Sequence, residues 1–242
     1  MVFRLLLFLS MTQIQLSGFA FTLVIDPGHG GEDHGATQGT IKESEIALKV
    51  ALKLAEQCSK DPSLTVILTR PNDSSISLRN RVALNQSYNG NLFISLHVNS
   101  SIDNRAKGAD FYIGNAKSLS PALVSQTSPS TSTLSQSTKE SNKTVTTILE
   151  NVRQTVKLYQ SQYLAADTFN SWGDLAVTAP RSIKQGPFYV INKNDTPSIL
   201  VEFGFITNTK EALELIKEEN QTAIAQSLYR AVKKFQNRQE RY

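Results

Sequence analysis

The strongest constraint on the fold is that two apolar patterns alternate along the chain: short runs typical of buried strands, and residues recurring every three or four positions as in helices. The expected strands cover residues 22–25, 63–69, 91–97, 109–113, 187–191 and 198–203. The expected helices cover residues 44–60, 77–88, 144–172 and, as one or two helices, 210–235. We therefore predict an α/β fold with a largely parallel twisted sheet of about six strands and helices on both faces.

Two of these helices have informative apolar positions. In residues 77–88 we expect Leu78, Val82 and Leu84 to point inward and Arg79 and Arg81 to be more exposed. In the helix expected over 144–172, the apolar residues at helical spacing are Val145, Ile148, Leu149, Val152, Val156 and Tyr159.

Residues 1–20 have the three-part pattern of a secretory signal. Arg4 supplies a positive charge, residues 5–11 form an apolar run too short to span a bilayer, and small residues precede a cleavage point after Ala20. We predict a signal peptide over 1–20, one folded domain over 21–242 without a transmembrane segment, and export to the periplasm or cell envelope. An uncleaved anchor and a first strand are the alternatives.

Composition limits the partners and the metal chemistry. The formal charge of +4 comes without a dense basic run, so we expect no nucleic-acid partner. The single cysteine, Cys58, excludes an intramolecular disulfide and a cysteine-based zinc cluster. A bound metal would therefore be held by carboxylates and by the three histidines of the chain.

Residues 118–143 are rich in Ser and Thr and poor in large apolar residues. Such a segment buries too little surface to offset the entropy lost on ordering. Because further strands follow, we interpret it as a flexible insertion within the domain.

Four polar residues fall at or near the carboxyl ends of expected strands, where sites form in such sheets. They are His29, Glu43, His97 and Glu202. Glu202 follows an apolar run, so its burial requires a partner or a function. Two imidazoles and a carboxylate form a common catalytic zinc set. We predict His29, Glu43 and His97 as ligands of one zinc ion and Glu202 as the proton-transferring group.

Each assignment has an alternative. His29 and His97 suit ordinary loop and strand-end positions, and Glu43 suits a helix N-terminus, where Glu45 competes as a ligand. Glu202 would also fit a structural ion pair with Arg70, Arg79 or Arg81.

Three further residues lie near the expected site. We interpret His34 as a loop residue, Asp26 as a structural turn residue or a hydrogen-bond partner of a ligand, and Asn99 as a residue that orients the strand end or contacts substrate.

Several segments, in this order, resemble the zinc-dependent N-acetylmuramoyl-L-alanine amidases of the Amidase_3 family, the type that includes cell-division amidases. They are residues 25–31 (IDPGHGG), 35–36 (GA), 42–43 (KE), 68–70 (LTR), 78–81 (LRNR), 93–99 (FISLHVN) and 200–208 (LVEFGFITN). The resemblance implies an amidase catalytic domain over 21–242 that binds one Zn²⁺ through His29, Glu43 and His97, with Glu202 catalytic. It also implies cleavage of the amide bond between N-acetylmuramic acid and L-alanine in peptidoglycan.

In related cell-division amidases an inserted helix covers the zinc until a protein activator displaces it. Here the insertion is weakly helical, so we expect it to obstruct the cleft poorly and to permit activity without an activator. We expect a monomer. The competing functions are a zinc peptidase or carboxypeptidase acting on stem peptides, and a non-catalytic wall-binding protein.

Overall fold

The computed structural model describes residues 21–115, 137–173 and 179–240. The signal peptide expected over 1–20 and most of the insertion expected over 118–143 lie outside these residues. No helix within the described ranges combines the length and the apolar character needed to cross a membrane.

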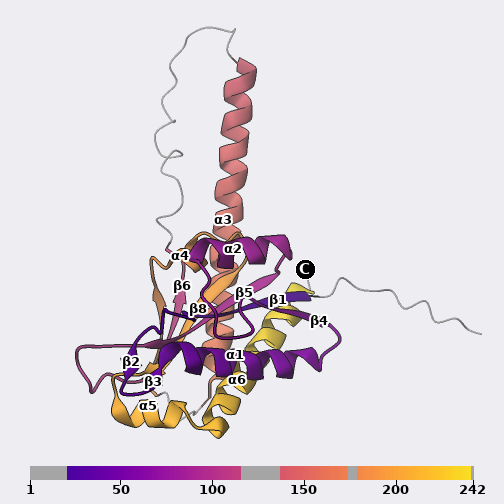
Figure 1. Cartoon of the computed structure of the whole chain (residues 1–242). Coiled ribbons are helices and arrows are strands. Elements are labelled where there is room, and N and C mark those ends of the chain that lie inside the picture. The colour runs from indigo at the N-terminus through magenta and orange to yellow at the C-terminus, as the bar shows by residue number, and fades with distance from the viewer. Residues whose placement is uncertain (1–20, 116–136, 174–178, 241–242) are drawn as a thin grey trace, which may run out of the picture.

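A six-stranded sheet forms the centre of the fold (Figure 1), in the order β4-β1-β5-β8-β6-β7. The strands are β1 (Phe21–Pro27), β4 (Leu64–Leu68), β5 (Leu92–Asn99), β6 (Ala109–Ile113), β7 (Arg181–Gln185) and β8 (Ser198–Phe205). The first four strands in this order are parallel, β6 runs antiparallel to β8, and β7 runs parallel to β6. The largely parallel α/β sheet predicted from the sequence is thus confirmed.

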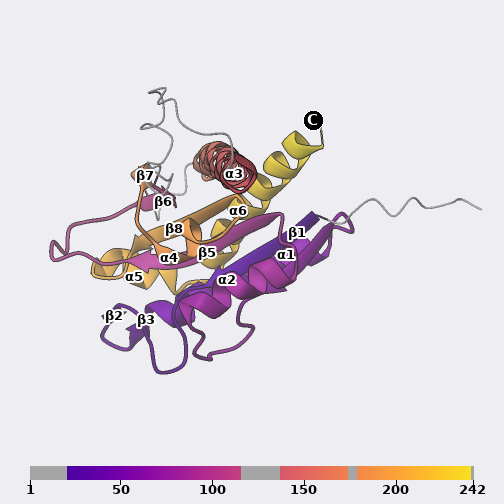
Figure 2. The same cartoon turned by 90° about the horizontal axis from the view of Figure 1, so that it is seen from above.

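Helices cover both faces of the sheet, as Figures 1 and 2 show. The larger apolar cluster joins alternate residues of β1, such as Leu23 and Ile25, to the helices of one face. These helices are α1 (Glu43–Ser59), α3 (Ser137–Ser171), α5 (Thr209–Leu215) and α6 (Glu218–Gln239). A smaller cluster joins Val24, on the opposite face of β1, to α4 (Tyr189–Asn192). Beside α4 lies α2 (Leu78–Ser87), and a short hairpin of β2 (Thr37–Gln38) and β3 (Ile41–Lys42) precedes α1.

The strand expected over 187–191 is wrong. This segment forms the short helix α4, in which Val190 and Ile191 are buried, and the strand lies upstream as β7. A short apolar run does not distinguish a strand from a buried helical turn. β7 lies at the edge of the sheet and is mostly exposed, so its residues need not be apolar. Its polar sequence therefore lacks the apolar run that would have predicted a strand.

The orientation expected for α2 is correct for Val82, which is buried, and for Arg79, which is exposed, but it is wrong at two other positions. Arg81 is buried, whereas Leu78 is exposed. The Arg81 guanidinium lies 2.7 Å from Asp26 Oδ1 and donates to the carbonyl oxygens of Pro27 and His29. Asp26 also accepts hydrogen bonds from Thr69 and Ser95. The buried ion pair thus determines which face of α2 points inward. The hydrogen bonds of Asp26 and Arg81 connect α2, β5 and the loop after β4 to the end of β1.

This ion pair yields a stability prediction. Arg81→Leu leaves the Asp26 carboxylate buried without its cation, so we expect a loss of about 3–5 kcal/mol in the free energy of unfolding, measured by urea denaturation. Arg79→Leu, at an exposed position of the same helix, is the control and should change it by less than about 0.5 kcal/mol. Equal losses in the two variants would contradict a special role for the buried pair.

Candidate active site

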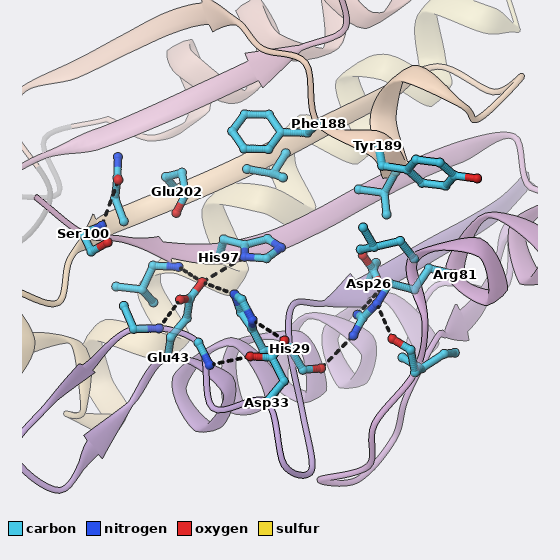
Figure 3. Close-up of a pocket in the computed structure, with 18 of the residues that line it drawn as sticks. Asp26, His29, Asp33, Glu43, Arg81, His97, Ser100, Phe188, Tyr189 and Glu202 are labelled. Atoms are coloured by element: carbon cyan, nitrogen blue, oxygen red, sulfur yellow. Dashed lines mark hydrogen bonds and ion pairs between the residues drawn. The ribbon is translucent and has the colours of Figure 1, made fainter.

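Three side chains converge where the carboxyl ends of β1 and β5 lie side by side (Figure 3). His29 follows β1, His97 lies near the end of β5, and Glu43 is the first residue of α1. Buried Arg70 fixes the loop that carries His29, because its guanidinium donates to the carbonyl oxygens of Pro27 and Gly28. The pairing of β1 with β5, together with buried Arg70 and Arg81, therefore holds His29 near His97.

The Glu43 carboxylate is the centre of this cluster. Its Oε1 lies 3.2 Å from His29 Nε2 and 2.8 Å from His97 Nδ1, and one donor atom from each of the three residues falls within 4.8 Å of the others. Backbone N–H groups of Val98 and Ala36 donate to Oε1 and Oε2. The hydrogen bonds of Glu43 therefore fix the direction of its carboxylate toward both imidazoles.

Glu45, the competing ligand, does not join the cluster. It is exposed and lies 3.5 Å from the Lys42 ammonium. His34 is likewise exposed in the loop. The two positions differ because Glu43 begins the helix on the side of the histidines, whereas a residue two positions later points about 200° around the axis.

Close packing leaves no room for larger side chains beneath the cluster. A Cβ atom on Gly28 would lie 2.3 Å from the His97 ring, and one on Gly35 would lie 2.5 Å from Glu43 Oε2. Glycine at these positions lets the backbone approach both groups closely.

Asp33 orients His29, and the sequence analysis did not identify it. Its Oδ2 lies 2.8 Å from His29 Nδ1, and its Oδ1 accepts from the Gly35 N–H. A proton on Nδ1 is therefore donated to Asp33, and Nε2 is the ring nitrogen that faces Glu43. Because both residues lie in a loop, their four-residue spacing carried no signal in the sequence.

The charges in the cluster shift its protonation equilibria. Burial opposes a charged His29, but the hydrogen bonds and charges of Glu43 and Asp33 outweigh it and raise the pKa of His29 to about 9. Burial likewise opposes a charged Glu43, but the two histidines hold the pKa of that carboxyl far below its usual range. A cation in this position would replace the proton on His29.

Zinc affinity should therefore depend on pH. A ligating imidazole is neutral, whereas with a pKa of about 9 His29 is mostly protonated at pH 7. We expect the affinity to rise about tenfold from pH 7 to pH 8, measured by competition with a chromophoric chelator. In Asp33→Asn, which lacks one of the charges that raise this pKa, the dependence should be weaker. An affinity that is constant over this interval would contradict a protonated His29.

Glu202 lies on β8 beside the cluster, where it is the register partner of His97 in β5 and of Asp110 in β6. Its side chain is buried, and Oε2 has no hydrogen-bond partner among the described residues. Burial raises the pKa of Glu202 to about 7, with the neighbouring His97 opposing this and Glu43 and Asp110 adding to it. A carboxyl with a pKa near neutrality is suited to accept and return a proton.

The structure does not form the ion pair considered for Glu202. Arg81 pairs with Asp26, Arg70 binds backbone carbonyl oxygens, and Arg79 is exposed on α2. The buried charge of Glu202 is thus left without a structural cation among the described residues.

Asn99 lies at the end of β5 and lines the same cavity as the cluster. Its amide donates to Asp110, and its Oδ1 accepts from the Ser100 N–H. These contacts suit a residue that orients the strand end.

The cavity above the cluster has a volume of about 690 Å³. The metal-ligand candidates and Glu202 contribute to its polar lining, and Figure 3 shows Phe188 and Tyr189 across the cavity from Glu43 and His29. The apolar wall continues through Leu78, Val190 and Leu200. The site therefore accommodates a ligand with a polar reacting group and an adjoining less polar portion.

A His–Glu–His cluster beside a buried glutamate, at the carboxyl edge of the strands of an α/β sheet, has the residue types and the position of a metal-dependent hydrolase site. The family model described as N-acetylmuramoyl-L-alanine amidase (Amidase_3) matches residues 23–234, and the chain belongs to this family.

Individual relatives agree with this assignment. The amidase AmiC of Escherichia coli O6:H1 is 27% identical over 217 residues, which cover 88% of this chain and 52% of AmiC. A protein of Buchnera aphidicola from Acyrthosiphon pisum is 32% identical over 88% of this chain and 94% of its own length. The CwlD amidase from Clostridioides difficile, solved in complex with the GerS lipoprotein, is similar in structure with a TM-score of 0.69 and 25% identity, over 89% of this chain and 98% of CwlD. This chain spans about half the length of the first of these curated relatives.

Proposed function

We propose that this protein is a zinc-dependent hydrolase that cleaves the amide bond between N-acetylmuramic acid and L-alanine in peptidoglycan. The observation that carries the proposal is the convergence of His29, Glu43 and His97 beside the buried Glu202, in a member of the amidase family.

The donor set fits zinc. Two imidazole nitrogens and one carboxylate oxygen are typical catalytic zinc ligands, and ligand atoms about 2 Å from one ion lie within about 4 Å of one another. The distances of 3.2 and 2.8 Å from Glu43 Oε1 to the two histidines suit such sharing. When bound, zinc supplies Lewis acidity that polarises a carbonyl group and lowers the pKa of water.

Glu202 would transfer the proton. Its unpaired Oε2 accepts a proton from the attacking water, and the resulting carboxylic acid returns it to the leaving L-alanine nitrogen. A pKa of about 7 permits both steps near neutral pH. Asp33 would hold the His29 ring in the orientation that presents Nε2 to the ion.

The activity is tested by mass spectrometry of muropeptides after incubation of purified peptidoglycan with the protein. We expect products with a free L-alanine amine, and their loss on treatment with a zinc chelator. Release of D-alanine instead would favour the carboxypeptidase alternative, and binding without any product would favour a non-catalytic wall-binding protein.

Residues 1–20 support a further part of the proposal, namely export to the periplasm or cell envelope with residues 21–242 as the catalytic domain. The resemblance to division amidases supports a role in cell division as part of this proposal. The complex of the related CwlD with the GerS lipoprotein supports a protein partner for this chain.

A further inference from the structure

A row of apolar side chains runs along the face of α3 that points away from the sheet. Each of these residues keeps between 48% and 60% of its surface exposed: Val145, Leu149, Val152, Val156, Tyr159 and Tyr163. We call this row the α3 seam. The opposite face of the helix packs on the body of the protein through Ser161, Leu164, Ala165 and Thr168, all buried. The apolar spacing found in the sequence therefore marks a surface rather than a part of the core.

Other residues of the helix explain why this seam is left on the outside. Lys157 is buried on the inner face, and its ammonium donates to the carbonyl oxygens of Ile191 and Asn192. Ser161 accepts from the Ser198 N–H at the start of β8. These polar contacts fix the rotation of α3 about its axis. In Figure 1 the first half of α3 extends well beyond the sheet and its helices.

The spacing of the seam is that of a coiled coil. Its residues are separated alternately by four and three positions, which is the seven-residue pattern that keeps one narrow seam facing a partner helix. At 1.5 Å per residue the seam is about 27 Å long. This geometry selects a helix as the occupant of the seam.

The order of separations is the same read from either end, so the seam is complementary to an antiparallel copy of itself. A twofold axis near residue 154 would place Val145 against Tyr163 and Leu149 against Tyr159, with Val152 against Val156 at the centre. Each large aromatic ring then meets a smaller aliphatic side chain. In a parallel pair each residue would instead contact the same residue of the second copy. The two tyrosine pairs would then lie at one end of the seam and the aliphatic pairs at the other.

We propose that the α3 seam is an interface between two copies of this chain, paired antiparallel. The interface is isologous, so two copies close the assembly, and this dimer takes the place of the monomer expected from the sequence. None of the residues that line the active-site cavity lies on α3, so the seam is separate from that cavity.

The oligomeric state tests the proposal. We expect size-exclusion chromatography with light scattering to give twice the monomer mass for the purified chain. Val152→Glu places a charge at the centre of the seam in each copy and should weaken dimerisation at least tenfold, without loss of folding because the position is exposed in one chain. Leu213→Glu is the matched control: an apolar residue on α5, 51% exposed and off the seam, whose substitution should leave the dimer intact. Neither substitution should alter amidase turnover.

Cysteine crosslinking tests the orientation, because the one native cysteine, Cys58, is buried. The double variant Val145→Cys/Tyr163→Cys should form intermolecular disulfides on mild oxidation, whereas Val145→Cys alone should not. A monomer at all concentrations, a dimer unaffected by Val152→Glu, or efficient crosslinking by Val145→Cys alone would each overturn the proposal. So would a dimer that forms only after deletion of residues 116–136, since these residues would then cover the seam.

Discussion

Glu202→Gln is expected to reduce amide hydrolysis about a thousandfold while zinc remains bound. The glutamine side chain has the same shape as glutamate, but it neither accepts a proton from water nor returns one to the leaving nitrogen. Because Glu202 is not one of the three clustered ligand candidates, the zinc content should stay near one ion per chain. Turnover of purified muropeptides and metal content by atomic absorption measure the two quantities separately.

The stability of the same variant provides its control. Burial raises the pKa of Glu202 from 4.5 to about 7, so the folded protein binds this proton more tightly than the unfolded chain does. The contribution of Glu202 to stability is therefore present below pH 4.5 and is lost as pH rises toward 7. Metal-free Glu202→Gln has no such loss and should unfold at a higher temperature than the parent at pH 8. A variant that loses zinc or unfolds more easily would show that Glu202 acts structurally.

Removing a predicted ligand should abolish both metal binding and activity. In Glu43→Gln the cluster loses its negative charge and the carboxylate that lies within 3.2 Å of both histidines. We expect zinc affinity to fall by more than about a hundredfold, since even residues that only support a ligand change affinity by ten- to a hundredfold. Equilibrium dialysis against buffered zinc measures the affinity, and turnover at saturating zinc measures the activity.

Glu45→Gln is the matched control for this variant. It makes the same chemical change two residues later in α1, where the side chain is exposed and paired with Lys42. It should leave both affinity and turnover within about twofold of the parent. If instead Glu45→Gln lost zinc and Glu43→Gln kept it, the carboxylate ligand would be Glu45 and not Glu43.

Much of the site was predictable from the sequence because its residues are attached to strong local patterns. His29, His97 and Glu202 lie within or next to apolar strand segments, and the carboxyl ends of parallel strands meet at one edge of a sheet. The position of Glu43 followed from the helix that begins there. The sequence analysis did not identify Asp33 because this residue lies in a loop, where neither periodicity nor propensity indicates the direction of a side chain.

The sequence by itself determined the alternation of strands and helices, and with it the α/β class and the edge of the sheet that carries the candidate ligands. Only the tertiary structure decided which faces are buried. Arg81 turns inward because Asp26 lies opposite it, β7 pairs at the sheet edge without an apolar pattern, and α3 leaves its apolar seam exposed. Periodicity shows that a helix has an apolar face, but the partner of that face comes from distant residues, which local sequence does not specify.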